Sequence, residues 1–266
     1  RSGDIAAYLE MRDKVLVEAQ TQLDELASGM ARALSDITTP GTPATAGTQA
    51  GFDLDLSGLI AASTISVTWT DTLTGGKHTA TLVRVDDPKA LPVPDTFTPD
   101  PNDRVIGIDF SGGFAAAIAQ MNAAFNGQLQ FSNPAGNTLR VLNDSALGTS
   151  TIDAASMTTT TTALSAGTPE LPFFLDGAEF FTGAPGASRP QSVGFAGRIT
   201  VNPSLFADPS KLVVLGSGTA SGDQTRPAFL YDKLTTAART SGPASGIGSE
   251  TAPYSGSLSS FLRQAM

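Results

Sequence analysis

The first forty residues carry an apolar residue at every seventh position, and this stripe constrains the fold more than any other feature. Its members are Leu9, Leu16, Leu23, Met30 and Ile37. Further apolar residues follow them by three or four positions, so the spacing predicts a long amphipathic helix with one continuous apolar edge. Such a helix obtains most of its stability by packing that edge against another element. We therefore expect a helix-packing interface, with a segment far along this chain or on another chain, formed by Leu9, Leu16, Leu23, Leu26, Met30 and Ile37.

Polar residues predict the limits and the outer face of this helix. Asp4 is a candidate N-cap, and Asp36 with the following Thr39 to Pro43 marks the end, because proline disfavours helical backbone. The charged residues lie largely off the apolar edge and are expected in solvent: Glu10, Asp13, Lys14, Glu18, Asp24, Glu25 and Arg32. The pattern fits an ordinary core helix, and it also fits a bundle helix in an elongated assembly.

Composition excludes several classes of function. The chain has 266 residues, of which 40% are hydrophobic, enough for a sizeable core in one or two domains. Sixteen Lys and Arg oppose 25 Asp and Glu, for a net charge of −9, so nucleic acid is not an expected partner. The sequence contains no run of eighteen apolar residues, so membrane insertion is not expected. The absence of cysteine excludes disulfides and thiolate metal sites.

The middle of the chain changes from helical to two-residue periodicity. Residues 65–69 alternate apolar and polar side chains and predict one strand of a hairpin, with 78–85 as its partner. They are followed by a strand at 104–110 and by a helix at 114–125 that begins after Ser111 and stops at Asn126-Gly127. Strands at 129–131 and 138–142 and an extended threonine run at 158–162 come next. We expect an α+β chain in which residues 1–44 and 191–266 form a discontinuous helical rod-type domain. Residues 45–190 are expected to form an inserted β-rich domain that contains one short helix.

Candidate catalytic residues are few. His78 is the only histidine and stands beside Lys77 in a polar hairpin, where a solvated residue is expected. No sequence motif for a cofactor, a metal or a nucleophile is present, so no cofactor is expected. Two acidic pairs leave a weak calcium site or a catalytic carboxylate pair open, namely Asp53 with Asp55 and Asp100 with Asp103. Four phenylalanines flank Asp176 and Gly177 and predict a turn held by aromatic packing.

Several segments resemble one protein family. Residues 2–13 and 22–27 are similar to the central helical segment of the bacterial flagellar hook-associated protein 1 family, the hook–filament junction proteins, and Gly51-Phe52-Asp53-Leu54 stands where the family has a Gly-x-Asp-Leu stretch. Residues 197–203, 207–212 and 222–223 resemble the family's segment that leads back into its helical domain. Residues 195–234 and the stretch from Gly256 resemble the alphaproteobacterial forms.

The resemblance implies a mechanical function without catalytic residues. It implies an adaptor that joins the flagellar hook to the next junction protein and that associates with itself in a ring in the full-length protein. It also implies secretion through the flagellar export channel to an extracellular location. Arg1-Ser2-Gly3 and a helical pattern that stops at Met266 suggest a central fragment without the family's terminal rod segments.

Two other classes remain as alternatives. The Thr/Ser/Gly-rich strands and the acidic balance also fit a secreted adhesin or glycan-binding β module, with a site around Trp69 or the phenylalanines near Asp176. A hydrolase that uses one of the two acidic pairs is the third possibility.

Overall fold

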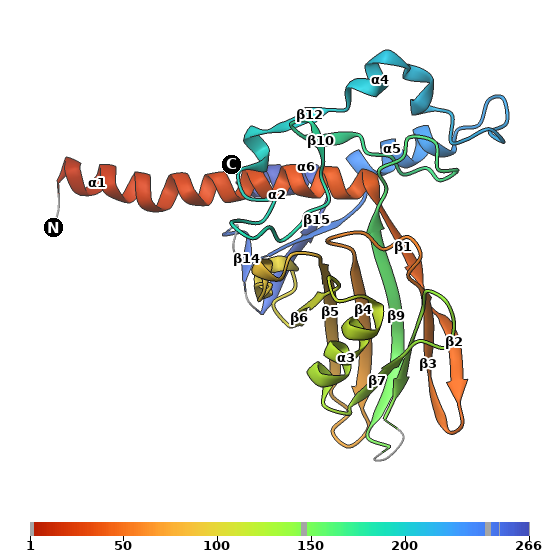
Figure 1. The fold of residues 1–266 in the computed structure, drawn as a ribbon. Coiled ribbons are helices and arrows are strands. Elements are labelled where there is room, and N and C mark those ends of the chain that lie inside the picture. The colour runs from red at the N-terminus through yellow and green to blue at the C-terminus, as the bar shows by residue number, and fades with distance from the viewer. Residues whose placement is uncertain (1–2, 145–147, 243–245, 250, 266) are drawn as a thin grey trace.

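The computed structural model describes residues 3–144, 148–242, 246–249 and 251–265. It has a mixed α+β fold with several separate sheets, and the expected fold class is confirmed at that level. A long helix lies across one end of a β-rich body, and its first part stands free of the body (Figure 1). Among the described residues, no helix combines the length and the apolar character that a membrane crossing requires.

The long helix is continuous from Asp4 to Ser35. It consists of α1 (Asp4–Glu10), a π-helical turn η1 (Met11–Val15) and α2 (Leu16–Ser35). Its N-cap is Gly3, whereas Asp4, the predicted cap, is the first helical residue.

The helix ends two residues before the predicted stripe does. Ile37, the last member of the stripe, lies in strand β1 (Asp36–Pro40) and pairs with Thr159 of β9 (Ser150–Thr160). The physical reason is that Ile37 and the threonines after it are β-branched, which favours strands, and that β9 offers them a ladder of backbone partners. Asp36 already has extended backbone, with φ −84° and ψ 129°.

Two sheets and one helix enclose the main hydrophobic core. One sheet has the order β1-β9-β4-β5-β6 and the other β2-β3-β8-β7. The remaining strands are β2 (Thr42–Ala46), β3 (Gln49–Asp55), β4 (Thr64–Asp71), β5 (Lys77–Val85), β6 (Asp103–Asp109), β7 (Leu129–Ser132) and β8 (Thr138–Asn143). Helix α3 (Phe114–Phe125) contributes Met121 and Phe125 to this core, where they meet Val67, Trp69 and Val141 of the sheets.

Local predictions in this body are largely confirmed. The hairpin of β4 and β5 and the strands β6, β7 and β8 lie where expected. Helix α3 ends at Asn126, whose left-handed backbone has φ 48°, as its Asn-Gly stop signal predicts. Its N-cap is Gly113 and not Ser111.

The rest of the chain returns to the long helix. Strands β10 (Phe174–Asp176), β11 (Glu179–Phe180) and β12 (Ile199–Val201) form a small sheet. The short helices are η4 (Phe195–Gly197), α4 (Pro203–Ala207), η5 (Pro209–Leu212), α5 (Thr225–Thr235) and α6 (Leu258–Ala265). Strands β13 (Arg239–Ser241), β14 (Gly248–Ser249) and β15 (Ala252–Gly256) form a second small sheet. Elements β10, η4, α5 and α6 all contact α2.

The chain leaves α2 and comes back to it at the same place. Strands β1 and β9 pair antiparallel there, and the N–H of Thr161 donates to the carbonyl of Ser35 at 2.8 Å. The N–H of Leu171 then donates to the carbonyl of Leu34 at 2.8 Å. The chain therefore passes from the long helix into the large sheet at residue 36 and leaves that sheet at residue 161.

Candidate functional site

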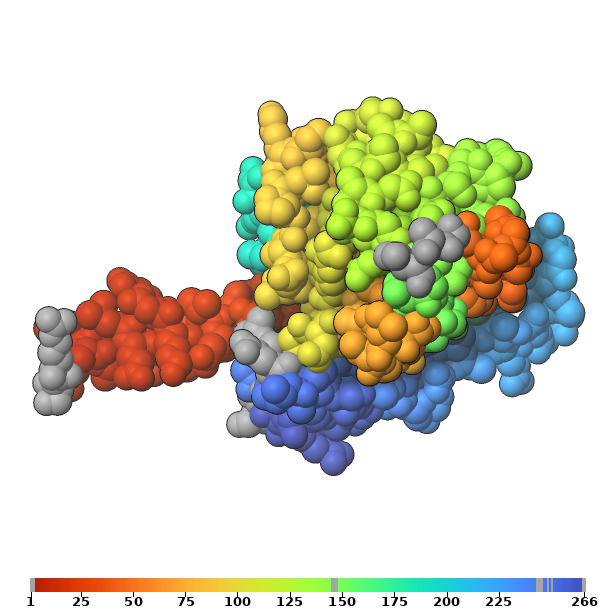
Figure 2. All heavy atoms as spheres, turned by 90° about the horizontal axis from the view of Figure 1, so that it is seen from below, coloured from red at the N-terminus to blue at the C-terminus, as the bar shows by residue number. Residues whose placement is uncertain are grey.

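The first half of the apolar stripe is exposed to solvent. Leu9, Leu16 and Leu23 are 46%, 57% and 53% exposed. Figure 2 shows the first helix, in red, standing clear of the other atoms. Ile5, Tyr8 and several neighbouring apolar side chains are also exposed there. A continuous group of exposed apolar side chains of this kind marks an interaction surface.

The second half of the helix is covered, along a line beside the predicted one. The buried side chains on α2 include Ala27, Ala31 and Leu34, whereas Leu26 and Met30 of the stripe are half-buried. Ala27 and Ala31 pack on Phe181 and Phe195, whose rings stack with centroids 4.0 Å apart. The small alanines let this aromatic pair approach the helix closely.

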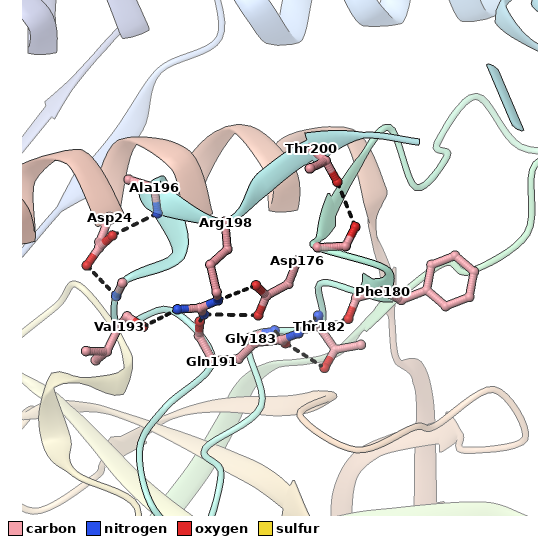
Figure 3. Close-up of polar contacts among 12 residues, drawn as sticks. Asp24, Asp176, Phe180, Thr182, Gly183, Gln191, Val193, Ala196, Arg198 and Thr200 are labelled. Atoms are coloured by element: carbon pink, nitrogen blue, oxygen red, sulfur yellow. Dashed lines mark hydrogen bonds and ion pairs between the residues drawn. The ribbon is translucent and has the colours of Figure 1, made fainter. Parts of the chain in front are cut away.

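Asp24 fixes the returning segment on the helix by hydrogen bonds (Figure 3). Its Oδ2 accepts the N–H of Gly194 at 2.6 Å, and its Oδ1 accepts the N–H of Ala196 at 2.8 Å. Asp24 was predicted in solvent but is only 8% exposed. A buried carboxylate is stable only when such donors surround it. Asp24 therefore connects α2 specifically to residues 194–196.

The Arg198–Asp176 ion pair and the side-chain amide of Gln191 hold residues 176–198 together (Figure 3). Arg198 donates to both carboxylate oxygens of Asp176, at 2.6 and 3.0 Å, and also to the carbonyls of Gln191 and Val193. The side-chain oxygen of Gln191 accepts the N–H groups of Thr182 and Gly183. The Asp176–Gly177 turn predicted from the flanking phenylalanines is present between β10 and β11.

Arg226 organises the far end of the returning segment. Its side chain is fully buried and donates to six backbone carbonyls. They belong to Leu164, Thr168, Pro169, Glu170, Lys211 and Val214. Burial lowers the pKa of Arg226, and nearby Glu170 opposes that effect. The guanidinium thus joins two loops to the start of α5.

A groove of about 1100 Å³ runs beside α2. Its walls are the proline-rich loop of residues 94–102, residues 183–193, and the segments 239–242 and 256–261. Residues 16–32 of α2 form the remaining wall. The groove therefore continues directly from the exposed stripe of the long helix.

The predicted acidic pairs are engaged in other contacts. Arg140 donates to both oxygens of Asp53 at 2.7 Å, and this bond is the main reason that the pKa of Asp53 lies below its ordinary value. Asp55 is exposed and accepts the N–H of Ser57. Asp100 is exposed, whereas Asp103 is buried and accepts the hydroxyl of Thr81 at 2.6 Å. Within the described residues, no group of three or more His, Asp or Glu side chains is placed to hold a metal.

A small pocket of about 190 Å³ lies at the end of β4 and β5. Its lining includes His78, Asn102, Arg104 and Gln128. His78 is exposed and stacks on Trp69 with ring centroids 5.3 Å apart, so most of the Trp69 surface is covered. Trp69 itself is only 5% exposed.

No protein-family model, curated protein or solved structure matches this chain. Functional inference therefore depends on the geometry above and on the sequence resemblance. Sequence reasoning found the exposed stripe but missed the roles of Asp24 and Arg226. Neither residue has a local pattern that distinguishes it from a surface charge, because both find their partners far along the chain.

Proposed function

We propose that this chain is a structural component of the bacterial flagellum, an adaptor at the hook–filament junction. One observation carries the proposal: an exposed apolar helix, Asp4 to Leu23, continues into a covered helix against which the C-terminal third of the chain packs. A helix of this kind suits a subunit that joins its neighbours by helix packing. The segment resemblance to the hook-associated protein 1 family gives that geometry its biological setting.

The proposed domain plan has a rod and an insertion. Residues from both ends of the chain form a discontinuous helical rod-type domain, and the two sheets with α3 form the inserted β-rich domain that faces solvent. Two observations support this plan. The strands that lead into and out of the sheets, β1 and β9, pair with each other next to Ser35. None of the residues in the core between the sheets comes from the long helix.

In this proposal the partners are protein surfaces outside the cell. They are the hook protein on one side and the next junction protein on the other, with further copies of the same protein beside it in a ring. The chain has no catalytic role and needs no cofactor. It is exported through the flagellar channel and acts extracellularly.

Immunogold electron microscopy would test the location. Antibodies against the chain should label flagella of the source bacterium at the distal end of the hook, and deletion of the gene should leave hooks without filaments. Labelling of the cell surface away from flagella, or normal filaments after deletion, would contradict the proposal. Antibodies against hook protein provide the positive control for position.

A glycan-binding adhesin is the alternative from another class, and the pocket beside Trp69 is its best site. It has polar side chains in convergent positions, but Trp69 offers little free ring for a sugar to stack on. A glycan array decides between the two proposals. Specific binding that is lost in Gln128→Ala would favour the adhesin.

A hydrolase has less support. The pKa of Asp53 is lowered, which is opposite to what a general acid at neutral pH requires. Asp53→Asn would leave any hydrolytic activity of the preparation unchanged if this carboxylate has no catalytic role.

A further inference from the structure

The groove beside α2 contains buried cationic groups that lack acceptors. In the described part of the chain, Nε of Arg32 and both Nε and Nη1 of Arg239 are buried without a hydrogen-bond partner. Arg239 lies against the helix, because a Cβ on Gly29 would stand 3.8 Å from its Cδ. Buried donors on a charged side chain are unfavourable unless an acceptor reaches them. Both arginines also line the groove, so its wall carries two guanidinium groups that form no ion pair with a carboxylate among the described residues.

The acidic residues that line the groove do not supply those acceptors. Asp24 accepts backbone N–H groups of residues 194 and 196, and Glu25 accepts the N–H of Gly242. Neither they nor Asp95 form an ion pair with either arginine in the described structure. The pKa of Arg239 is lowered by burial, as expected for a guanidinium without a carboxylate beside it.

The rest of the groove is suited to an amphipathic helix. Its lining presents apolar side chains around the arginines, namely Leu16, Val17, Leu26, Phe97, Leu258 and Phe261. The wall from Leu16 to Arg32 spans sixteen residue steps, or about 24 Å of helix. An occupant should therefore be a helix of roughly this length or shorter, with apolar residues and carboxylates on its surface.

The projecting helix of this same chain has those properties. From Asp4 to Val15 it spans about 17 Å, and it exposes Ile5, Tyr8 and Leu9. Glu10 on this helix and Glu18 just after it are exposed and form no ion pair among the described residues. The projecting helix runs directly into α2 without a break, so it cannot fold back into the groove of its own molecule. Only a second copy can present it there.

We propose that the projecting helix of one copy docks in the groove beside α2 of the next copy. Its apolar side chains pack on the apolar lining, and the carboxylates of Glu10 and Glu18 lie opposite the guanidinium groups of Arg32 and Arg239, which line the groove. The contact joins two different surfaces, so it builds a ring if the rotation between copies closes and an open filament if it does not. The contact rests on the proposed function, in which copies form a ring, and specifies the surfaces that join them. Because it uses only this chain's surfaces, its test can fail while the labelling experiment succeeds.

Sedimentation velocity of the 266-residue chain, measured over a range of concentrations, would test this contact. Two variants test the two surfaces of the contact separately. The double variant Ile5→Glu with Leu9→Glu alters the projecting helix, and Arg239→Glu alters the groove. The wild-type chain should form concentration-dependent oligomers, and each variant alone should associate at least about tenfold more weakly. A mixture of the two variants should form a 1:1 dimer and nothing larger, because only one intact contact can form.

Matched controls guard against unspecific effects. Leu73→Glu changes an 80% exposed leucine in the β4–β5 turn, and Arg263→Glu changes an exposed arginine outside the groove. Both should assemble like the wild-type chain. Gly29→Leu provides a second groove variant, which fills the groove without removing charge and should also weaken association if Arg239→Glu fails to fold.

Three results would overturn the contact. They are a wild-type chain that is monomeric at all concentrations, groove variants that assemble as the wild-type chain does, and helix and groove variants that do not complement each other. The last result would indicate that the projecting helices pair with one another instead.

Discussion

Asp24 on the long helix accepts the backbone N–H of Gly194, 170 residues further along the chain, at 2.6 Å. This bond and the neighbouring one to Ala196 place η4 directly on α2, with Phe195 between them in the aromatic pair. The attachment is polar and directional at one point and apolar around it. It therefore defines the position of the returning segment more precisely than apolar packing alone can do.

Replacing Asp24 should loosen this attachment. In Asp24→Ala two partly buried backbone amides lose their acceptor, so the free energy of unfolding should fall by about 2–3 kcal/mol. Hydrogen exchange should accelerate at residues 194–197 and remain slow in β4 and β9. Glu18→Ala, an exposed acid on the same helix, is the control and should change stability by less than about 0.5 kcal/mol at concentrations below those at which copies associate. Equal protection of residues 194–197 in both variants would show that the carboxylate does not hold the segment.

Arg226 should be among the most sensitive residues of the chain. Arg226→Met keeps much of the side-chain volume but leaves six partly buried carbonyls without their donor, so we expect destabilisation of more than about 4 kcal/mol. Urea denaturation measures this loss. Arg226→Lys should recover only part of the stability, since an ammonium has three donors and no planar fork. The exposed Arg263 is the control site, and Arg263→Met should be nearly neutral.

The raised pKa of Asp36 predicts that the stability of the folded chain depends on pH. Burial raises its pKa above the ordinary value, although Arg32 and the hydroxyl of Thr160 act in the opposite direction. The ionised form is thus less favourable in the folded chain than in the unfolded chain. That cost is present above the raised pKa and disappears below the unfolded value of about 3.9, where both states are protonated.

Asp36→Asn should therefore raise the melting temperature at pH 7. The amide oxygen can still accept from Thr160, which now donates to Asp36 at 2.6 Å. The gain over the wild-type chain should shrink as the pH falls through the raised pKa and vanish in acid. Asp55→Asn, at an exposed carboxylate, should show no such trend. A variant less stable than the wild-type chain at pH 7 would indicate that the attraction to Arg32 outweighs burial.

The sequence predicted those elements whose signals are local. Helix α3 was located because its apolar spacing and its Asn-Gly stop lie within a few residues of one another. The β4–β5 hairpin was found from its alternation and its turn. In both cases the information sits in consecutive residues, and tertiary contacts reinforce it.

What sequence reasoning missed depends on contacts between distant segments. Asp24 has the same helical spacing as the exposed charges around it, and only η4 makes it a buried residue. Ile37 continues the seven-residue spacing, yet it lies in a strand because its backbone pairs with β9. In the same way, nothing near residue 36 indicates that its strand partner is Thr160.

A substitution at Gly51 would test how closely β3 and β8 approach each other. A Cβ at this position would stand 2.0 Å from the carbonyl oxygen of Val141, and the other nearest atoms are also backbone of β8, so no side chain can move away to make room. Gly51→Ala should therefore shift the strand register or cost more than about 3 kcal/mol. Gly58→Ala is the matched control, since its Cβ would meet nothing within 4 Å. Thermal unfolding followed by circular dichroism compares the two variants.

The last prediction concerns the long helix, whose two halves should respond differently when an apolar side chain is shortened to alanine. Leu34 is fully buried, so Leu34→Ala should destabilise the chain by about 2–5 kcal/mol. Leu9→Ala should change the stability of the monomer by less than about 0.5 kcal/mol, since Leu9 is 46% exposed. Both measurements belong at concentrations below those at which copies associate. If Leu9→Ala instead destabilises the monomer as strongly as Leu34→Ala, the projecting helix packs within its own chain and is not available to a partner.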